Sequence, residues 1–389
     1  MADRSPRRDV LLFLTGGPGQ TGVGFAPIVA DDLAPLLDEY RLVMIDQRGT
    51  GERAIDCPEL QGAVGASDLL TASSSAVRAC AKVVGKSRGF YTTADTVADL
   101  DALRRALRAR EWVVNGVSYG SFVAQRYAIA HPDHVRALVL DSVVPPDGLD
   151  TFLRVNLRRS AYVLRDVCRE DPPCLSDPAK DLAKVIREGV VDNVGLLHAL
   201  TLQSIVDPSF REMADAPGLL LRAAQGDASG LEEYIERFRA IGLFPADELS
   251  AGAHVATLCA DLRFPWGDAG TPMKQRRSAL ARAARRIKGD QVWPFDPKTA
   301  ASHGMIKSCL DWPPVSTRLK LDAADLPDIP VLLLHGERDL STPMAWAREA
   351  ARAWPDARLV EIPNDGHSVQ TDGTETLGGR VLTRFLRDL

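Results

Sequence analysis

The sequence contains no apolar stretch of the roughly 20 residues that a membrane-spanning helix needs, so we expect no membrane partner. The apolar run Val10–Leu14 is also far too short for the core of a secretion signal, and the basic segment Met1–Arg8 before it is expected to be a loose terminus. Basic residues are not in excess, because the net charge is −5 at pH 7. We therefore expect no nucleic-acid partner.

None of the cysteines forms a C-x-x-C pair, which weakens zinc-site and thioredoxin-like interpretations, and we expect neither a metal nor an organic cofactor. An even number of cysteines permits three disulfides, which would place the protein in an oxidising compartment. Unpaired cysteines in a cytosolic enzyme are the alternative, and composition alone leaves both open. The six cysteines are Cys57, Cys80, Cys168, Cys174, Cys259 and Cys309.

What is present is an alternation of short apolar runs with amphipathic segments. Hydrophobic residues make up 45% of the chain and charged residues 25%, the balance of a globular protein. Continuous apolar runs predict strands that are buried on both faces, and this β-α-β order predicts a mostly parallel sheet with helices on both sides. The expected strands are 10–15, 41–45, 112–115, 137–140, 330–334 and 358–362; the expected helices are 94–108, a segment from Ser118 to His131, 343–354 and 377–389.

The middle of the chain has a different pattern. With 389 residues, the chain is too long for one ordinary core. Between 145 and 325 strand signals vanish, apolar residues keep helical spacing, and proline pairs interrupt the pattern. We predict a helical cap insertion at 145–325, which separates two parts of one core, 1–144 and 326–389.

A candidate nucleophile stands where a predicted strand turns into a helix. Gly116-Val117-Ser118-Tyr119-Gly120 matches the G-x-S-x-G nucleophile-elbow pattern in that context. The turn forces Ser118 into a strained backbone conformation, and the two glycines relieve crowding. Serine needs a base to remove its proton.

The remaining members of a catalytic triad follow later in the chain. Asp339 ends the predicted strand 330–334 in the segment His335-Gly336-Glu337-Arg338-Asp339, and His367 lies in a turn after the last strand. The order Ser, Asp, His is the order expected in the α/β-hydrolase fold, which is the fold we predict. Asp339 would fix the tautomer of His367, and His367 would act on Ser118. Asp141 also ends a strand and is kept as an alternative acid.

An oxyanion hole needs two N–H donors. We expect these from Tyr119, the residue after the nucleophile, and from Gly17 in the loop after the first strand, where glycine lets the backbone approach a substrate closely.

Other conspicuous residues have simpler interpretations. His335 and His131 are expected to be structural, and Arg48 and Asp46 to brace a turn. The string from Gly17 to Gly22 matches G-x-G-x-x-G after a strand. However, Pro18 interrupts it and the residues after it start a helix poorly, so we do not expect a nicotinamide cofactor.

Several motifs together resemble peptidase family S33 of the α/β hydrolases, in its tripeptidyl-aminopeptidase-like and prolyl-aminopeptidase-like branch. They cover most of both sheet segments and are more specific than the elbow alone. The motifs are Gly16-Gly17-Pro18-Gly19, Asp46-Gln47-Arg48-Gly49-Thr50-Gly51, the segment 91–100, the elbow, Leu138-Val139-Leu140-Asp141 and Asp339-Leu340-Ser341-Thr342-Pro343.

The resemblance implies cleavage of short peptides at a free N-terminus under a helical cap that holds the substrate amine. It also implies the disulfides Cys57–Cys80, Cys168–Cys174 and Cys259–Cys309, and hence a secreted or periplasmic protein, with a cytoplasmic one as the alternative. Candidate amine-binding acids in the insertion are Glu170, Asp171, Glu232, Glu233 and Asp261.

The sequence departs from the family pattern at three places. Thr15 stands where prolyl aminopeptidases commonly carry histidine, and Glu52 stands where serine or an apolar residue is usual. The first strand pair of the fold also has no counterpart before residue 10.

We therefore predict a serine hydrolase that cleaves amide bonds at the N-terminus of short peptides through an acyl-enzyme. The alternative is a carboxylic-ester hydrolase with the same triad, because one fold hosts many chemistries. A non-enzymatic member of the fold would be expected to have a broken triad, and the residues for an intact one are all present.

Overall fold

The apolar runs predicted as strands form one parallel sheet. In the computed structural model, which describes residues 8–65, 67–170, 174–316, 326–371 and 373–389, the strand order is β2-β1-β3-β4-β5-β6. Neighbouring strands pair in parallel throughout this sheet, as predicted. The strands are β1 (Asp9–Leu14), β2 (Tyr40–Met44), β3 (Trp112–Val117), β4 (Val135–Asp141), β5 (Pro330–Gly336) and β6 (Asp356–Ile362).

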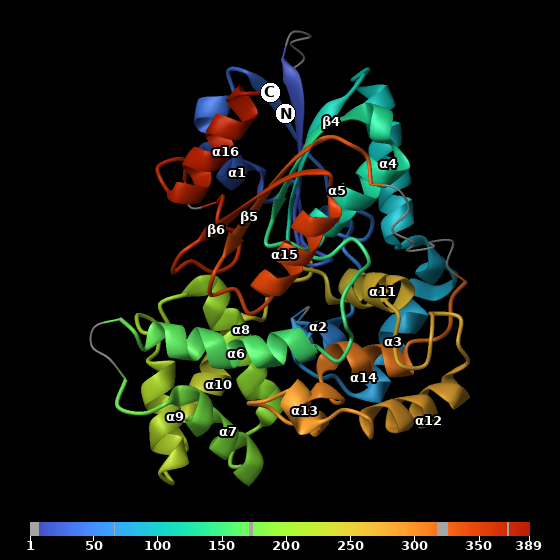
Figure 1. The fold of residues 1–389 in the computed structure, drawn as a ribbon. Helices are drawn as coiled ribbons and strands as arrows, with labels where there is room; N and C mark the ends of the chain where they lie inside the picture. The colour runs from blue at the N-terminus through green and yellow to red at the C-terminus, as the bar shows by residue number, and fades with distance from the viewer. Residues whose placement is uncertain (1–7, 66, 171–173, 317–325, 372) are drawn as a thin grey trace.

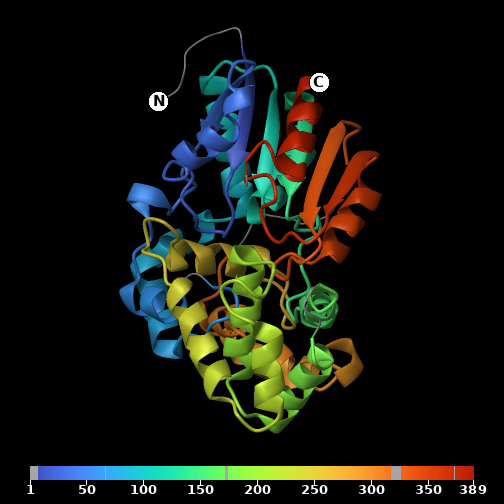
Figure 2. The same ribbon diagram turned by 90° about the vertical axis from the view of Figure 1, so that its left-hand side faces the viewer.

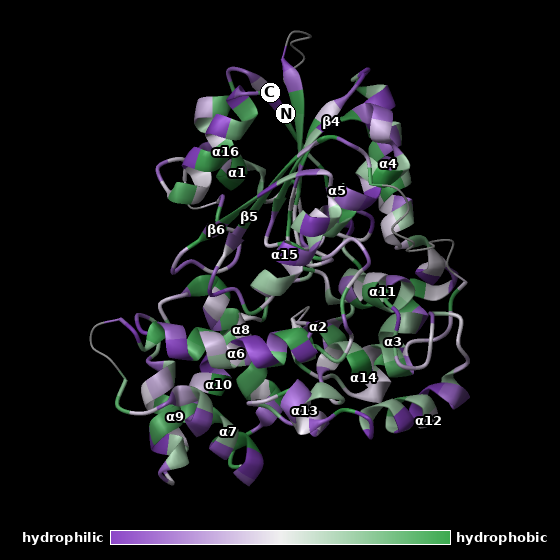
Figure 3. Cartoon of the chain, in the orientation of Figure 1, coloured by the Kyte–Doolittle hydropathy of each residue, from purple (hydrophilic) through white to green (hydrophobic). Residues whose placement is uncertain are grey.

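Helices cover both faces of the sheet, and side chains alternate between them as the pleat requires. Leu12 and Leu14 of β1 belong to the cluster that packs under α4, α5 and α15. Leu11 and Phe13 belong to the opposite cluster, under α1 and α16. These helices are α1 (Ala26–Asp32), α4 (Thr93–Ala106), α5 (Tyr119–Ala130), α15 (Met344–Ala353) and α16 (Leu377–Arg387). Figure 3 shows the apolar strands between helices whose outer faces are polar.

Local signals explain where these helices begin and end. A capping box of Thr92 and Asp95 starts α4, because the side chain of each residue accepts a hydrogen bond from the backbone N–H of the other. Helix α5 stops at His131, directly before Pro132.

A helical layer follows β4 and lies against the carboxyl ends of the strands (Figures 1 and 2). Over residues 145–170 and 174–316, the chain forms helices and contributes no strand to the sheet. Its helices are α6 (Arg154–Val167), α7 (Pro178–Glu188), α8 (Asn193–Val206), α9 (Ala216–Ala224), α10 (Ser229–Ile241), α11 (Ala251–Asp261), α12 (Met273–Ala284), α13 (Pro297–Ala300) and α14 (Gly304–Asp311). The predicted end of the insertion, at 325, lies outside the described residues.

Two helices from the first part of the chain pack with this helical layer rather than with the sheet. They are α2 (Pro58–Val64) and α3 (Ser74–Val84), which the sequence interpretation did not foresee. Leu60 and Val77 share one apolar cluster with Leu258 of α11 and Ile306 of α14. The cap, as we use the word below, is therefore α2, α3 and α6–α14.

Three disulfides cross-link the cap, in the pairing that the family resemblance implies. Cys57–Cys80 joins the start of α2 to α3, Cys259–Cys309 joins α11 to α14, and Cys168–Cys174 closes a short loop after α6.

Candidate active site

The strand-turn-helix at Ser118 has the geometry that its sequence predicts. Ser118 has φ 57° and ψ −124°, a conformation that costs an L-residue free energy and is kept only when its surroundings enforce it. A Cβ on Gly116 would lie 2.2 Å from the carbonyl oxygen of Gly120, and a Cβ on Gly120 would lie 2.2 Å from that of Leu14. Both flanking glycines are therefore required for the turn to pass between its neighbours.

Two hydrogen bonds to its backbone hold Ser118 at the start of α5. The Ser118 N–H donates to the Asp141 carbonyl at 2.9 Å, and the Ser121 hydroxyl donates to the Ser118 carbonyl at 2.6 Å. Tyr119 is the first residue of α5, so its N–H has no acceptor within the helix. This donor belongs to a helix end that favours negative charge.

The loop after β1 lies directly against the serine. A Cβ on Gly16 would come within 2.9 Å of the Ser118 Cβ, and Gly17 has φ 103°, which favours glycine. Gly17, Ser118 and Tyr119 line one pocket. The two predicted oxyanion donors are thus on the same pocket wall as the predicted nucleophile.

Asp339 and His367 meet through a hydrogen bond. His367 Nδ1–H donates to Asp339 Oδ2 at 2.8 Å, although the residues lie in loops after different strands. Asp339 is fully buried and also accepts the Thr342 hydroxyl at 2.6 Å and the backbone N–H groups of Ser341 and Thr342 at 2.8 and 2.9 Å. Each carboxylate oxygen of Asp339 therefore accepts two hydrogen bonds.

The pKa values of the pair follow from this arrangement. Burial raises the pKa of Asp339, but the charge of His367 and the hydrogen bonds outweigh it and bring that pKa down to about 2. Burial lowers the pKa of His367, whereas Asp339, and to a smaller extent Asp141, raise it, and the net effect is a raised pKa. Asp339 therefore stays ionised and holds an imidazole that is a stronger base than a free histidine.

The structure distinguishes Asp339 from Asp141, the alternative acid. The Asp141 carboxylate accepts the Gln370 N–H at 2.9 Å and the Ser142 hydroxyl at 3.1 Å, and no hydrogen bond joins it to His367 in the described part of the chain. Burial raises the pKa of Asp141 to about 7.

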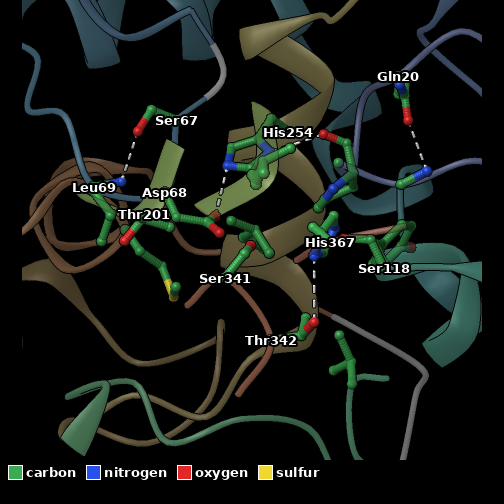
Figure 4. A pocket seen from close by; sticks show the side chains of 18 of the residues that line it. Gln20, Ser67, Asp68, Leu69, Ser118, Thr201, His254, Ser341, Thr342 and His367 are labelled. Carbon is green, nitrogen blue, oxygen red and sulfur yellow. Dashed lines mark hydrogen bonds and ion pairs between the residues drawn. The ribbon is translucent and has the colours of Figure 1, made fainter. Parts of the chain in front are cut away.

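The pocket between the sheet and the cap has a volume of about 370 Å³. Ser118, Tyr119 and His367 line it from the sheet side, and residues of α8 and α11 line it from the cap side (Figure 4). Most lining side chains are apolar. The charged ones are acidic, namely Asp68, Glu248 and Asp261, and the lining residues that the structure describes include no lysine or arginine.

Asp261, at the end of α11, is the most unusual acid of this pocket. Its Oδ2 accepts the Thr93 N–H and hydroxyl at 2.8 and 2.6 Å, whereas its Oδ1 is buried without a hydrogen-bond partner in the described structure. Thr93 Oγ1 lies 2.8 Å from the Tyr119 hydroxyl, which ties this carboxylate to the elbow. Burial raises the pKa of Asp261 to about 6, against the opposing hydrogen bonds from Thr93 and the charge of Arg126.

The other acids considered from sequence lie elsewhere. Glu170 accepts a hydrogen bond from Arg338, and Glu232 and Glu233 are exposed on α10, away from the pocket lining. Asp171 lies outside the described residues.

The residues expected to be structural make contacts within the protein. His335 is fully buried; its Nε2–H donates to the Thr342 carbonyl, and its Nδ1 accepts the Val143 N–H. His131 caps α5. Arg48 pairs with Asp95 and Asp99 of α4.

The string that resembles a dinucleotide loop serves a different purpose here. Asp46 Oδ1 accepts the Gly22 and Val23 N–H groups, and Gly19 packs against the start of α11, where a Cβ would lie 2.6 Å from the Ser250 carbonyl oxygen.

The described residues include no group of three or more His, Cys, Asp or Glu side chains placed to hold a metal ion. They also contain no helix long and apolar enough to cross a bilayer.

Comparison with known proteins identifies the family. Residues 9–374 match the model of the alpha/beta hydrolase fold. The chain belongs to the α/β-hydrolase family.

Among named relatives, this hydrolase is 27% identical over 425 residues to the tripeptidyl aminopeptidase of Streptomyces lividans, covering 98% of this chain and 75% of the relative. It is 33% identical over 133 residues to a proline iminopeptidase of Neisseria meningitidis, covering 34% of this chain and 32% of the relative. A solved hydrolase from Pseudomonas aeruginosa aligns with a TM-score of 0.46 and 18% identity, over 99% of this chain and 92% of that one. The resemblance stated from the motifs is confirmed by the first two.

Three contributors to the hydrolase site were missed from sequence. Thr342 completes a turn around Asp339, and its spacing of three residues after an aspartate was a readable signal. His254 of α11 lies 2.8 Å from the Pro18 carbonyl oxygen and 2.9 Å from Asp68 Oδ1, and so joins the cap to the glycine loop (Figure 4). Gln370 pairs with the Asn115 side chain, which no local pattern announces.

Proposed function

We propose that this hydrolase is a serine aminopeptidase that releases residues or short peptides from a free N-terminus. His367 Nε2 would take the Ser118 Oγ proton as the oxygen attacks the scissile carbonyl carbon. The oxyanion would be held by the Gly17 and Tyr119 N–H groups. Collapse of this intermediate would expel the amine with the proton from His367, and water would hydrolyse the acyl-enzyme by the same steps.

The observation that carries an aminopeptidase rather than a general esterase is the unpartnered Oδ1 of Asp261. A buried carboxylate oxygen without a partner costs free energy, so a cationic group that binds there recovers it. A substrate ammonium group fits, because the described pocket lining holds three carboxylates and no lysine or arginine. Hydrogen bonds from Asp261 to Thr93 and from Thr93 to Tyr119, the residue after Ser118, would hold this carboxylate at a fixed position relative to the nucleophile.

The test compares an aminoacyl amide that has a free amine with its N-acetylated form, using wild type, Asp261→Asn and Ser118→Ala. A charged hydrogen bond contributes about 1.5–3 kcal/mol, so Asp261→Asn should raise KM for the free amine about 10- to 100-fold and leave the blocked substrate unchanged. Glu233→Gln, on the exposed face of α10, is the matched control and should change neither. Equal turnover of free and blocked substrates by wild type would refute the aminopeptidase.

A carboxylic-ester hydrolase remains the second candidate because the pocket lining is mainly apolar. Turnover of short-chain esters alone, abolished by Ser118→Ala, would favour it.

We also infer that the protein works in an oxidising compartment, outside the cytoplasm. All six cysteines are paired, and disulfides rarely persist where thiols are kept reduced. Titration of free thiols in protein purified from its source under alkylating conditions should find none; six reactive thiols would contradict an exported location.

A further inference from the structure

We propose that Asp141 is a positioning residue for the reaction: it ties the loop that carries His367 to the turn that carries Ser118. The inference rests on the proposed roles of Ser118, Asp339 and His367, but not on whether the substrate is an amide or an ester.

Asp141 holds the nucleophile side with its backbone. It is the last residue of β4, fully buried, and its carbonyl accepts the Ser118 N–H at 2.9 Å. This hydrogen bond is made by the residue that adopts the strained elbow conformation, so it is one of the interactions that keep the strained turn in place.

Asp141 holds the histidine side with its carboxylate. Oδ2 accepts the Gln370 N–H at 2.9 Å, three residues after His367, and Oδ1 accepts the Ser142 hydroxyl at 3.1 Å. The Ser142 oxygen in turn accepts the Ser368 N–H at 2.8 Å. The residue next to His367 is thereby held at φ 69°, a value that a serine adopts only under constraint.

The neighbouring strand adds a second attachment to the same loop. The Gln370 and Asn115 side-chain amides exchange two hydrogen bonds, of 2.7 and 3.0 Å, and both residues are buried. The loop after β6 is therefore anchored to two strands, to β3 through Asn115 and to β4 through Asp141, and only the Asp141 side chain can carry charge.

The charge of Asp141 acts on His367 without a direct hydrogen bond. The groups whose charges act on His367 are Asp339, which is hydrogen-bonded to it, and Asp141, and both raise its pKa. His335, also close by, has its pKa lowered to about 4 by burial and is neutral. Around Asp141 itself the charged neighbours are His367 and Asp339.

This second acid has a different task from Asp339. Burial raises the pKa of Asp141 to about 7, whereas that of Asp339 is about 2. When His367 takes the serine proton, an imidazolium forms beside Asp141, and the ionised form of Asp141 becomes more favourable.

Two variants differ in whether the charge of Asp141 is removed. Asp141→Asn removes the charge and replaces one of the two accepting oxygens with an NH2 donor, whereas Ser142→Ala removes the acceptor for the Ser368 N–H and keeps the charge. The readouts are kcat and KM on the best substrate, the pH profile of kcat/KM, and the labelling rate with a fluorophosphonate that reacts with an activated serine. Asp101→Asn, at a buried carboxylate paired with Arg104 on α4, is the matched control.

Both site variants should lose kcat by about tenfold or more, with KM unchanged, because a misplacement of about 1 Å can cost about a hundredfold in rate. Only Asp141→Asn should also shift the acid limb of the pH profile, by about half a unit or more toward lower pH, since His367 loses a negative neighbour. Asp101→Asn should change neither.

The inference would be overturned if Asp141→Asn folds, as judged by circular dichroism, and labels and titrates as wild type does. If wild-type protein does not react with the fluorophosphonate at all, it is the proposed triad that fails. If Asp141→Asn does not fold, Ser142→Ala becomes the deciding test. A wild-type kcat in Ser142→Ala would then refute the positioning role.

Discussion

Removing the disulfides one at a time should destabilise the hydrolase in the order of the loops they close. A cross-link acts mainly by restricting the unfolded chain, so its effect grows with the length of the closed loop. Cys259–Cys309 spans a sequence separation of 50, Cys57–Cys80 one of 23 and Cys168–Cys174 one of 6. Loop entropy then assigns them about 4, about 3.5 and about 2 kcal/mol of stability.

The assay is urea unfolding of the three double Cys→Ala variants, followed by circular dichroism, with free energies compared at equal slopes. Cys259 and Cys309 are both buried at the contact of α11 with α14, so lost packing adds to their loss rather than offsetting it. The variant without Cys168–Cys174 is the internal control. If it loses as much stability as the variant without Cys259–Cys309, loop entropy does not govern these cross-links.

Three further outcomes follow from the site. Thr342→Val removes a hydroxyl donor to Asp339 and should lower kcat about 10- to 100-fold, as expected for a lost charged hydrogen bond of about 1.5–3 kcal/mol; a wild-type kcat would contradict the role given to this turn. Gly120→Ala should give a protein that is insoluble or melts far below wild type, because its Cβ would lie 2.2 Å from a backbone oxygen, whereas Gly62→Ala, with nothing within 4 Å, should melt near wild type. The kcat/KM of wild type should rise with pH through a midpoint above 6.5, because His367 must be neutral to act as a base and its pKa is raised; a midpoint below that value would show that the charges beside it do not dominate.

The sheet and the triad candidates were readable from the sequence for a definite reason. Strands buried on both faces read as continuous apolar runs, and the parallel order brings their carboxyl ends to one edge. Ser118 and Asp339 each follow such a run, whereas His367 follows the edge strand β6, which mixes apolar and charged residues and is only partly buried. Even the strain at Ser118 was implied, because glycines at 116 and 120 are required only if the chain turns sharply between them.

The sequence predicted that the cap is helical, but not which of its side chains line the pocket. Among the acids considered, Asp261 lines the pocket, whereas Glu232 and Glu233 face away from it. Helical spacing gives the faces of one helix, but which face meets a substrate depends on how several helices pack. Helices α2 and α3 were missed for a related reason: they precede the predicted insertion and are stabilised by helices far along the chain.

The pairing of Gln370 with Asn115 shows the same limit at the site. These residues are 255 positions apart and carry no shared motif. Only the assembly of the whole sheet brings these two residues together, and their contact holds the loop that carries His367.

The composition of the cap from two separate stretches has a consequence for engineering. Deleting the insertion after β4 would leave α2 and α3, with the Cys57–Cys80 bond, as an exposed apolar remnant on the sheet domain. A chimera that is meant to exchange substrate preference between two such hydrolases must therefore transplant both stretches together.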